Sequence, residues 1–134
     1  MFTGIVQRVG KIKKLDQAAD STTFFLETDD DYFQGMDKGA SVAVNGVCLT
    51  AERMGAEDVR VTAVHQTLEV TNLGDMKEGS AVNLEFPCTA NSFLGGHIVM
   101  GHVDGVATVT KIEKLEAGRE VYMAFPKDMM KYII

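Results

Sequence analysis

The sequence has few cysteines, few prolines, no long apolar run and no excess of positive charge. Its two cysteines, Cys48 and Cys88, stand in no metal-like spacing, so neither a disulfide framework nor a zinc knuckle is supported and both thiols are expected to be reduced. No stretch approaches the roughly 18 consecutive apolar residues of a membrane-spanning helix. The N-terminus shows no basic segment followed by an apolar run, as a signal peptide would. We therefore expect a soluble, cytoplasmic protein without a membrane partner.

Positive charge is the scarcer sign, with 13 lysines and arginines against 19 aspartates and glutamates and a net charge of -6. The densest basic cluster lies at residues 11–14. Because binding to nucleic-acid phosphates needs a concentrated basic surface, nucleic acid is not an expected partner. A phosphate-binding glycine loop is missing as well, since Gly95-Gly96-His97 and Gly101-His102 have neither the Walker nor the dinucleotide spacing. ATP and NAD chemistry therefore lose support.

The histidines do not form a metal-binding pattern. His97 and His102 are five residues apart, which on a strand puts their side chains on opposite faces. No cysteine or carboxylate joins them at the spacing of zinc ligands. No metal site is expected.

Glycine is abundant at 13 residues, proline is scarce at 2, and apolar residues come in short runs. This pattern predicts a mostly β protein whose many short strands form a barrel or sandwich. The predicted strands are Thr3–Lys13, Thr22–Glu27, Ser41–Asn45, Val47–Arg53, Val59–Val64, Ala81–Phe86 and Ile98–Ile112. Turn signals stand at Lys38-Gly39, Asn45-Gly46, Met54-Gly55 and Glu78-Gly79. Short helices are predicted at Asp30–Met36, Gln66–Val70 and Lys127–Ile133.

An internal repeat appears when the start of the chain is shifted onto its last third. The shift that places Gly4 on Gly101 aligns further identical or similar residues without a gap, among them Val6 with Val103, Val9 with Val106, Ile12 with Val109, Lys14 with Lys111 and Phe25 with Tyr122. Chance matching of small and β-branched residues is the alternative. A true repeat would give a first copy at residues 1–96 and an incomplete second copy at residues 97–134, which would need further strands, a partner chain or the first barrel to cover it.

Cys48 and His102 are the candidate chemical groups. Cys48 follows the turn at Asn45-Gly46, and strand alternation puts Cys48 and Thr50 on one face. Packing of Cys48 inside the barrel is the alternative interpretation, and His102 could equally be a packed or surface residue. Ser41, at a strand start, is a candidate polar group that is otherwise an ordinary turn residue.

Four ordered segments resemble the riboflavin synthases of the α-chain type: Met1–Val6 (MFTGIV), Asn45–Thr50 (NGVCLT), Thr71–Gly74 (TNLG) and Gly95–Gly105 (GGHIVMGHVDG). The resemblance covers essentially the whole chain. It implies an all-β fold, with a six-stranded Greek-key barrel and short helices at residues 1–96. Residues 97–134 would then be the incomplete start of a second, similar barrel.

The resemblance implies a transferase of riboflavin biosynthesis. The implied reaction is the last step of that biosynthesis, in which two molecules of 6,7-dimethyl-8-ribityllumazine dismutate to riboflavin and a ribitylamino-pyrimidinedione, with no metal or organic cofactor. His102 suits the proton transfer that this reaction needs, and Cys48 offers a nucleophile or a polar contact. Ser41 and Thr50 can hydrogen-bond to ring or added oxygen. Cys48, His102 and Ser41 are thus the expected catalytic residues.

The resemblance also implies which residues contact the substrate. They are Gly4, Ile5, Val6, Cys48, Leu49, Thr50, Thr62, Ala63, Val64, His65, Gln66, Thr67, Gly101, His102 and Val103, with Phe2 near the neighbouring site. One stretch departs from the family, which usually has an Asp-x-Met-x-Glu-Thr-Leu type of sequence at residues 62–68. Because Gln66 removes a charge but keeps an amide, we expect altered affinity or selectivity there.

The resemblance further implies a homotrimer with each active site between two subunits, and lumazine synthase as a partner. The trimer-forming C-terminal helix lies outside the 134 residues, so monomers or dimers are equally expected. The counterpart of Asn45–Thr50 in the second copy is absent too, and we expect ligand binding without turnover. The alternative function is a non-catalytic lumazine- or riboflavin-binding protein, like the optical carriers of luminous bacteria. Retention of both Cys48 and His102 favours the enzyme. A reductase flavin module would require an attached nicotinamide domain.

Overall fold

The structure is a computed structural model that describes residues 1–54 and 58–133. The chain divides into two compact units, Met1–Val103 and Asp104–Ile134. The first unit contains strands β1 (Arg8–Gln17), β2 (Ser21–Glu27), β3 (Ser41–Val44), β4 (Val47–Met54), β5 (Asp58–Val64) and β6 (Ala81–Glu85), with helix α1 (His65–Glu69) and the 3-10 helix η1 (Asn72–Asp75) between β5 and β6. The second unit contains β7 (Thr108–Leu115), β8 (Gly118–Ala124) and the 3-10 helix η2 (Lys127–Tyr132).

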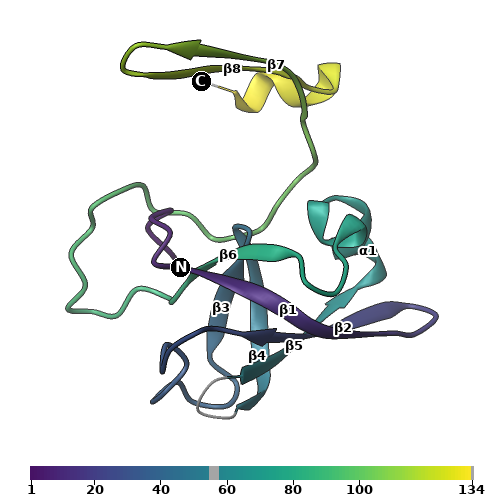
Figure 1. Cartoon of the computed structure of the whole chain (residues 1–134), viewed down its shortest axis with the longest axis vertical. Helices are drawn as coiled ribbons and strands as arrows, with labels where there is room; N and C mark the ends of the chain where they lie inside the picture. Colours follow the sequence, from purple (N-terminus) through teal and green to yellow (C-terminus); the bar gives the residue numbers. More distant parts are fainter. Residues whose placement is uncertain (55–57, 134) are drawn as a thin grey trace. The chain divides into compact units, whose positions relative to one another are not determined.

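The first unit is a closed barrel with the strand order β1-β2-β5-β4-β3-β6 (Figure 1). All neighbouring strands are antiparallel. β3, β4 and β5 are neighbours in chain order. β2, which precedes β3 in the chain, pairs with β5 and not with β3, which is a Greek-key arrangement. β6 pairs with both β3 and β1. Closure of the barrel pairs the edges that an open sheet would expose.

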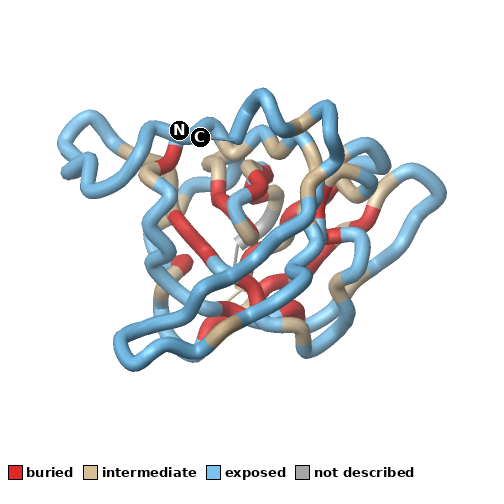
Figure 2. Tube along the Cα trace, turned by 90° about the horizontal axis from the view of Figure 1, so that it is seen from above, coloured by how far each residue is buried: buried red, intermediate tan, exposed pale blue. Residues whose placement is uncertain are grey.

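The hydrophobic core fills the barrel, and the alternation of buried residues is regular along two of its strands. Along β2 and β5 every second residue is buried, and the buried residues lie opposite one another, Phe24 with Val61 and Leu26 with Val59. In Figure 2 the buried residues appear in red along the trace. The turn between β3 and β4 has positive φ at Asn45 (50°) and Gly46 (82°), as the tight type I′ hairpin turn requires. The predicted turn at Asn45-Gly46 is therefore confirmed.

The second unit is a β7–β8 hairpin followed by η2, and it is the partial start of another barrel. Its register contains a β-bulge between Val109 and Lys111. The β1–β2 pair has its bulge between Ile12 and Lys14, which are the residues that the internal repeat aligns with Val109 and Lys111. The described residues supply no third strand to this sheet.

Two long strand predictions were wrong at glycines with positive φ. The strand predicted at Thr3–Lys13 begins only at Arg8 and extends to Gln17, because Gly4 (φ 77°) interrupts the extended backbone. The strand predicted at Ile98–Ile112 begins only at Thr108, because Gly101 (φ 79°) interrupts it in the same way. β8 was not predicted.

The helix predictions had mixed outcomes. The helix predicted at Gln66–Val70 is present as α1, and the one predicted at Lys127–Ile133 is present as the 3-10 helix η2. Residues 30–36 form turns instead of a helix, because the Asp30 side chain accepts a hydrogen bond from the Tyr32 amide (3.2 Å) and Gly35 has a positive φ of 80°. The turn predicted at Met54-Gly55 lies partly outside the described residues. In the described part of the chain, no helix has the length and apolar character needed to cross a membrane.

Candidate functional site

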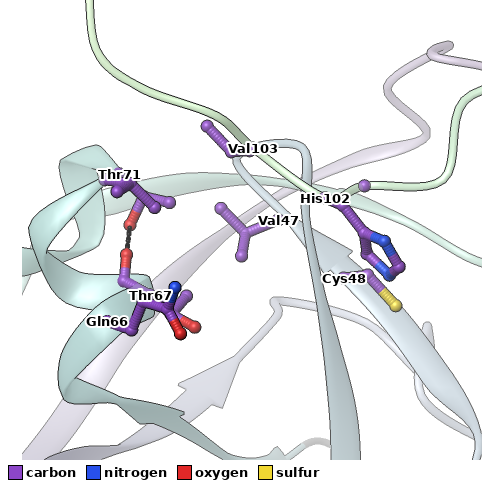
Figure 3. A pocket seen from close by; sticks show the side chains of 9 residues that line it. Val47, Cys48, Gln66, Thr67, Thr71, His102 and Val103 are labelled. Atoms are coloured by element: carbon purple, nitrogen blue, oxygen red, sulfur yellow. Dashed lines mark hydrogen bonds between the residues drawn. The ribbon is translucent and has the colours of Figure 1, made fainter.

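A pocket of about 220 Å³ opens on the first unit where the start of β4, the helix α1 and the segment after Met100 meet (Figure 3). β4 supplies Cys48 and the segment after Met100 supplies His102, which are the two groups predicted to do chemistry. Helix α1 and the residues that follow it supply polar side chains. The lining residues are Val47, Cys48, Gln66, Thr67, Val70, Thr71, Gly101, His102 and Val103.

Cys48 lies on the outer face of the barrel. Its neighbours Val47 and Leu49 are buried in the core, whereas Cys48 is half-buried and Thr50 is exposed. Ser41 pairs directly with Thr50, and opposite residues of an antiparallel pair share a face. The structure thus brings Ser41, Cys48 and Thr50 to one outer face, as the alternation predicted, and the alternative of Cys48 inside the barrel is wrong.

Gly101 holds its segment directly against Cys48. The Gly101 carbonyl accepts a hydrogen bond from the Cys48 amide at 2.9 Å. A Cβ on Gly101 would lie 2.8 Å from the Cys48 Cβ, and its φ of 79° is one that side chains rarely adopt. His102 follows at once and is exposed, with its ring beside the Cys48 side chain in Figure 3. The close approach of Gly101 therefore brings a thiol and an imidazole to one rim.

The opposite wall is built by α1 and the turn that follows it. The Thr71 hydroxyl donates a hydrogen bond to the Thr67 carbonyl (2.6 Å) and accepts one from the Leu73 amide (3.3 Å), which connects α1 to η1. A Cβ on Gly74 would lie 2.8 Å from the Leu68 carbonyl oxygen. The Thr71–Gly74 segment thus fixes α1 in place, and Val47 separates this wall from Cys48 and His102 in Figure 3.

Of the residues predicted to contact substrate, the structure gathers Cys48, Gln66, Thr67, Gly101, His102 and Val103 in this pocket. The remaining ones are not among its lining residues. Leu49 and Ala63 are buried in the barrel core, so only their backbone could meet a ligand. Thr62 shares a hydrogen bond with Thr23 (2.9 Å between the two hydroxyl oxygens). Gly4, Ile5, Val6, Thr50, Val64 and His65 are exposed elsewhere on the unit.

Three lining residues, Val47, Val70 and Thr71, were missed by the sequence reasoning. Thr71 had a signal, because it opens one of the four segments on which the resemblance rests. Val70 had none, since only the packing of α1 places it at the pocket. Within the described residues, no group of three or more His, Cys, Asp or Glu side chains could hold a metal ion.

Comparison with known proteins gives both a family and relatives. Residues 3–87 match the family model of the lumazine binding domain. The chain is 38% identical over 135 residues to the riboflavin synthase of Escherichia coli strain K12, an alignment that covers 100% of this chain and 63% of that protein. It is 37% identical to the riboflavin synthase of Bacillus subtilis strain 168, covering 96% of this chain and 58% of that protein. The chain thus spans less than two thirds of the length of these relatives.

Solved structures show the same similarity. The crystal structure of LumP complexed with riboflavin matches with a TM-score of 0.88 and 34% identity, covering 100% of this chain and 72% of that chain. LumP complexed with 6,7-dimethyl-8-(1'-D-ribityl) lumazine matches with a TM-score of 0.85 and 32% identity, covering 100% and 71%.

Proposed function

The chain belongs to the lumazine-binding domain family, and on that basis we propose that its pocket binds 6,7-dimethyl-8-ribityllumazine as part of a riboflavin synthase. One observation carries the proposal. The Cys48 thiol and the His102 imidazole meet at the rim of a single pocket on the outer face of the first barrel. A protein that only bound lumazine would have no need for both groups at one site.

The proposed reaction is the dismutation of two lumazines. A proton leaves an acidified methyl group of one ring, a nucleophile adds to the other ring, and a four-carbon unit passes between the rings. All atoms of the two substrates reappear in riboflavin and 5-amino-6-ribitylamino-pyrimidinedione, so no oxidant or cofactor is required. His102 would move the proton, and Cys48 would add to or contact the ring. Ser41 and Thr50 would hydrogen-bond to ring or added oxygen from the same barrel face.

The wall opposite Cys48 would orient the ring. Gln66 and Thr67 can hydrogen-bond to the pyrimidine edge, and Val47 and Val103 offer apolar surface to a ring face. The other predicted contacts, Gly4–Val6 and residues 62–65, do not line this pocket. They would contact the parts of the ligand that extend beyond the pocket, or would contact it through backbone groups. Because Gln66 is uncharged, we expect its contact to depend little on pH.

The size of the pocket bears on how the second substrate is held. Its volume of about 220 Å³ is below the roughly 300 to 1,000 Å³ of sites that enclose a drug-sized ligand. It therefore suits one lumazine ring, with the ribityl chain reaching outward. We propose that the second lumazine comes from another barrel of the same family, in a homo-oligomer for which the homotrimer is the expected form. Lumazine synthase stays an expected partner.

The second candidate function is a non-catalytic lumazine- or riboflavin-binding protein. The similarity to LumP in complex with both ligands favours it, because those structures match the whole of this chain. The two candidates agree on the ligand and differ in what Cys48 and His102 do. Only the enzyme requires these side chains for a chemical step.

Titration of the purified chain with 6,7-dimethyl-8-ribityllumazine, followed by ligand fluorescence and by the appearance of riboflavin, tests both candidates. Binding with riboflavin formation that is lost in Cys48→Ala and His102→Gln supports the synthase. Cys88→Ser and His97→Gln are matched controls, since they change the same residue types away from this pocket. Binding without turnover supports either the carrier or a synthase whose site needs a second barrel, and repeating the assay on a chain extended through its second barrel separates those two. No binding would overturn the ligand assignment.

A further inference from the structure

Glu85 is a buried carboxylate that the proposed reaction does not use. It ends β6, and the residue is only 7% exposed. Its Oε1 accepts two hydrogen bonds from one residue, from the Thr3 amide at 2.6 Å and from the Thr3 hydroxyl at 2.8 Å. A buried carboxylate needs such partners, and hydrogen bonds to a charged acceptor are stronger than neutral ones. Glu85 thus fixes both the backbone and the side chain of Thr3.

Thr3 belongs to a segment that holds the chain around Val99. The Phe2 amide donates to the Val99 carbonyl at 2.8 Å, and the Val99 amide donates to the Phe2 carbonyl at 3.1 Å. A Cβ on Gly96 would lie 2.2 Å from the Thr3 carbonyl oxygen, so the two segments approach as closely as a glycine allows. Phe2 is itself buried. The position of Val99 therefore depends on residues 2 and 3.

From Val99 the chain needs only two residues to reach the pocket. Gly101 makes its hydrogen bond to the Cys48 amide, and His102 follows. The segment that carries His102 is thus held at two points, by Phe2 at Val99 and by Cys48 at Gly101. Of these two contacts, only the Phe2–Val99 pair is connected, through the neighbouring Thr3, to the buried carboxylate of Glu85.

We propose that Glu85 is a positioning residue for the pocket: through Thr3 and the Phe2–Val99 pair it holds Gly101 and His102 over Cys48. The functional meaning of this role rests on the proposed function of the pocket, but the physical coupling does not. Loss of the anchor would let the segment at residues 99–102 open more often and would uncover the Cys48 thiol.

The coupling is tested in the full chain carrying Cys88→Ser, so that Cys48 is the only thiol. We expect Thr3→Val to speed the reaction of Cys48 with a disulfide reagent by roughly tenfold and to shift the NMR signals of the His102 ring, because local opening becomes more frequent. Glu85→Gln should act in the same direction with a smaller change. Thr3→Ser keeps the hydroxyl and should restore the original rate within about twofold. Thr28→Val is the matched control, since the Thr28 hydroxyl donates instead to the Asp30 carbonyl.

Unchanged Cys48 reactivity and His102 signals in a folded Thr3→Val variant would overturn the proposal. Hydrogen exchange of the unmodified chain gives a second test that needs no variant. The amides of Thr3, Val99 and Cys48 should open together, with protection factors within about threefold of one another. Clearly different protection of Thr3 and Cys48 would also contradict the coupling.

Neither measurement uses a ligand, so both test the positioning role of Glu85 even if the proposed function is wrong. If the unmodified chain binds lumazine and turns it over, Thr3→Val should lower kcat more than it raises KM, because the substrate wall at Gln66 and Thr67 is untouched. If the unmodified chain binds no lumazine, the proposed function is wrong while the thiol and exchange results still decide the coupling.

Discussion

The β1–β2 and β7–β8 hairpins have the same local structure in the two units. Their bulges fall at aligned positions. Lys14 lies over the Phe25 ring at 5.2 Å, and the aligned Lys111 lies over the Tyr122 ring at 5.4 Å. Lys14 is paired with Asp16, and Lys111 with the aligned Glu113. The internal repeat is therefore a repeat of hairpin geometry, which chance matching of residues would not produce.

The two hairpins differ in burial. Phe24 and Leu26 on β2 are 2% and 0% exposed, whereas the aligned Val121 and Met123 on β8 are 48% and 50% exposed. The first hairpin lies within a closed barrel, and the described residues supply no such cover for the second. Pairing and bulges thus need only the hairpin's own residues, while burial needs the other strands.

Alanine substitution at aligned positions should give the largest contrast. Leu26→Ala removes a fully buried side chain and should lower the free energy of unfolding of the barrel by about 3 kcal/mol. Met123→Ala removes a half-exposed one and should cost less than about 1 kcal/mol. Urea unfolding followed by circular dichroism measures both. Similar losses from the two substitutions would mean that β8 is covered in solution.

Gly4 and Gly101 sharpen the comparison at the pocket. The repeat aligns them and both have positive φ (77° and 79°), so the backbone strain of alanine should cost about 1 kcal/mol of stability at either position. Only at Gly101 would the new Cβ collide with Cys48, since the atom nearest to a Cβ on Gly4 is 3.9 Å away on Val99. Gly101→Ala should therefore weaken lumazine binding at least about tenfold and Gly4→Ala little. Equal affinities in a fluorescence titration would contradict this.

Alkaline pH should affect the first unit through Tyr32, which the repeat aligns with Met129. Burial is the largest cause that raises the pKa of Tyr32 to about 12, with the nearby Glu85 adding to it. Because the unfolded chain loses this proton near pH 10 and the folded one near pH 12, the contribution of Tyr32 to stability should be constant below pH 10 and fall between pH 10 and 12. Tyr32→Phe should have a shallower fall in that window when unfolding is measured as a function of pH. An identical pH profile for both proteins would exclude this role.

The smallest expected changes in stability test whether the matching lysine contacts of the two hairpins contribute equally. Lys14→Gln and Lys111→Gln each remove an exposed ion pair and an exposed cation–π contact. Each should change the free energy of unfolding of its own unit by less than about 1 kcal/mol, and added salt should reduce the change. A loss several times larger at Lys14 than at Lys111 would show that the contact depends on the barrel around it.

Much of the fold and part of the site were predictable from short-range pattern. The Asn45-Gly46 turn, the alternation that puts Cys48 and Thr50 outside, and the six-stranded barrel followed from turn chemistry, periodicity and the family resemblance. The ends of the strands at Gly4 and Gly101 were not predicted, because a glycine in a β-rich run can either continue the strand or break it. The contribution of Val70 to the pocket depends on how α1 packs, which the pattern of its own residues does not specify.

The sequence by itself determined the Asn45-Gly46 turn and the outward direction of Cys48, because backbone geometry over a few residues depends on those residues and their neighbours. Only the tertiary structure decided that Gly101 lies against Cys48 and that Glu85, 82 residues along the chain from Thr3, accepts hydrogen bonds from the Thr3 amide and hydroxyl. Such contacts join segments far apart in the chain, and they form only when barrel closure brings those segments together.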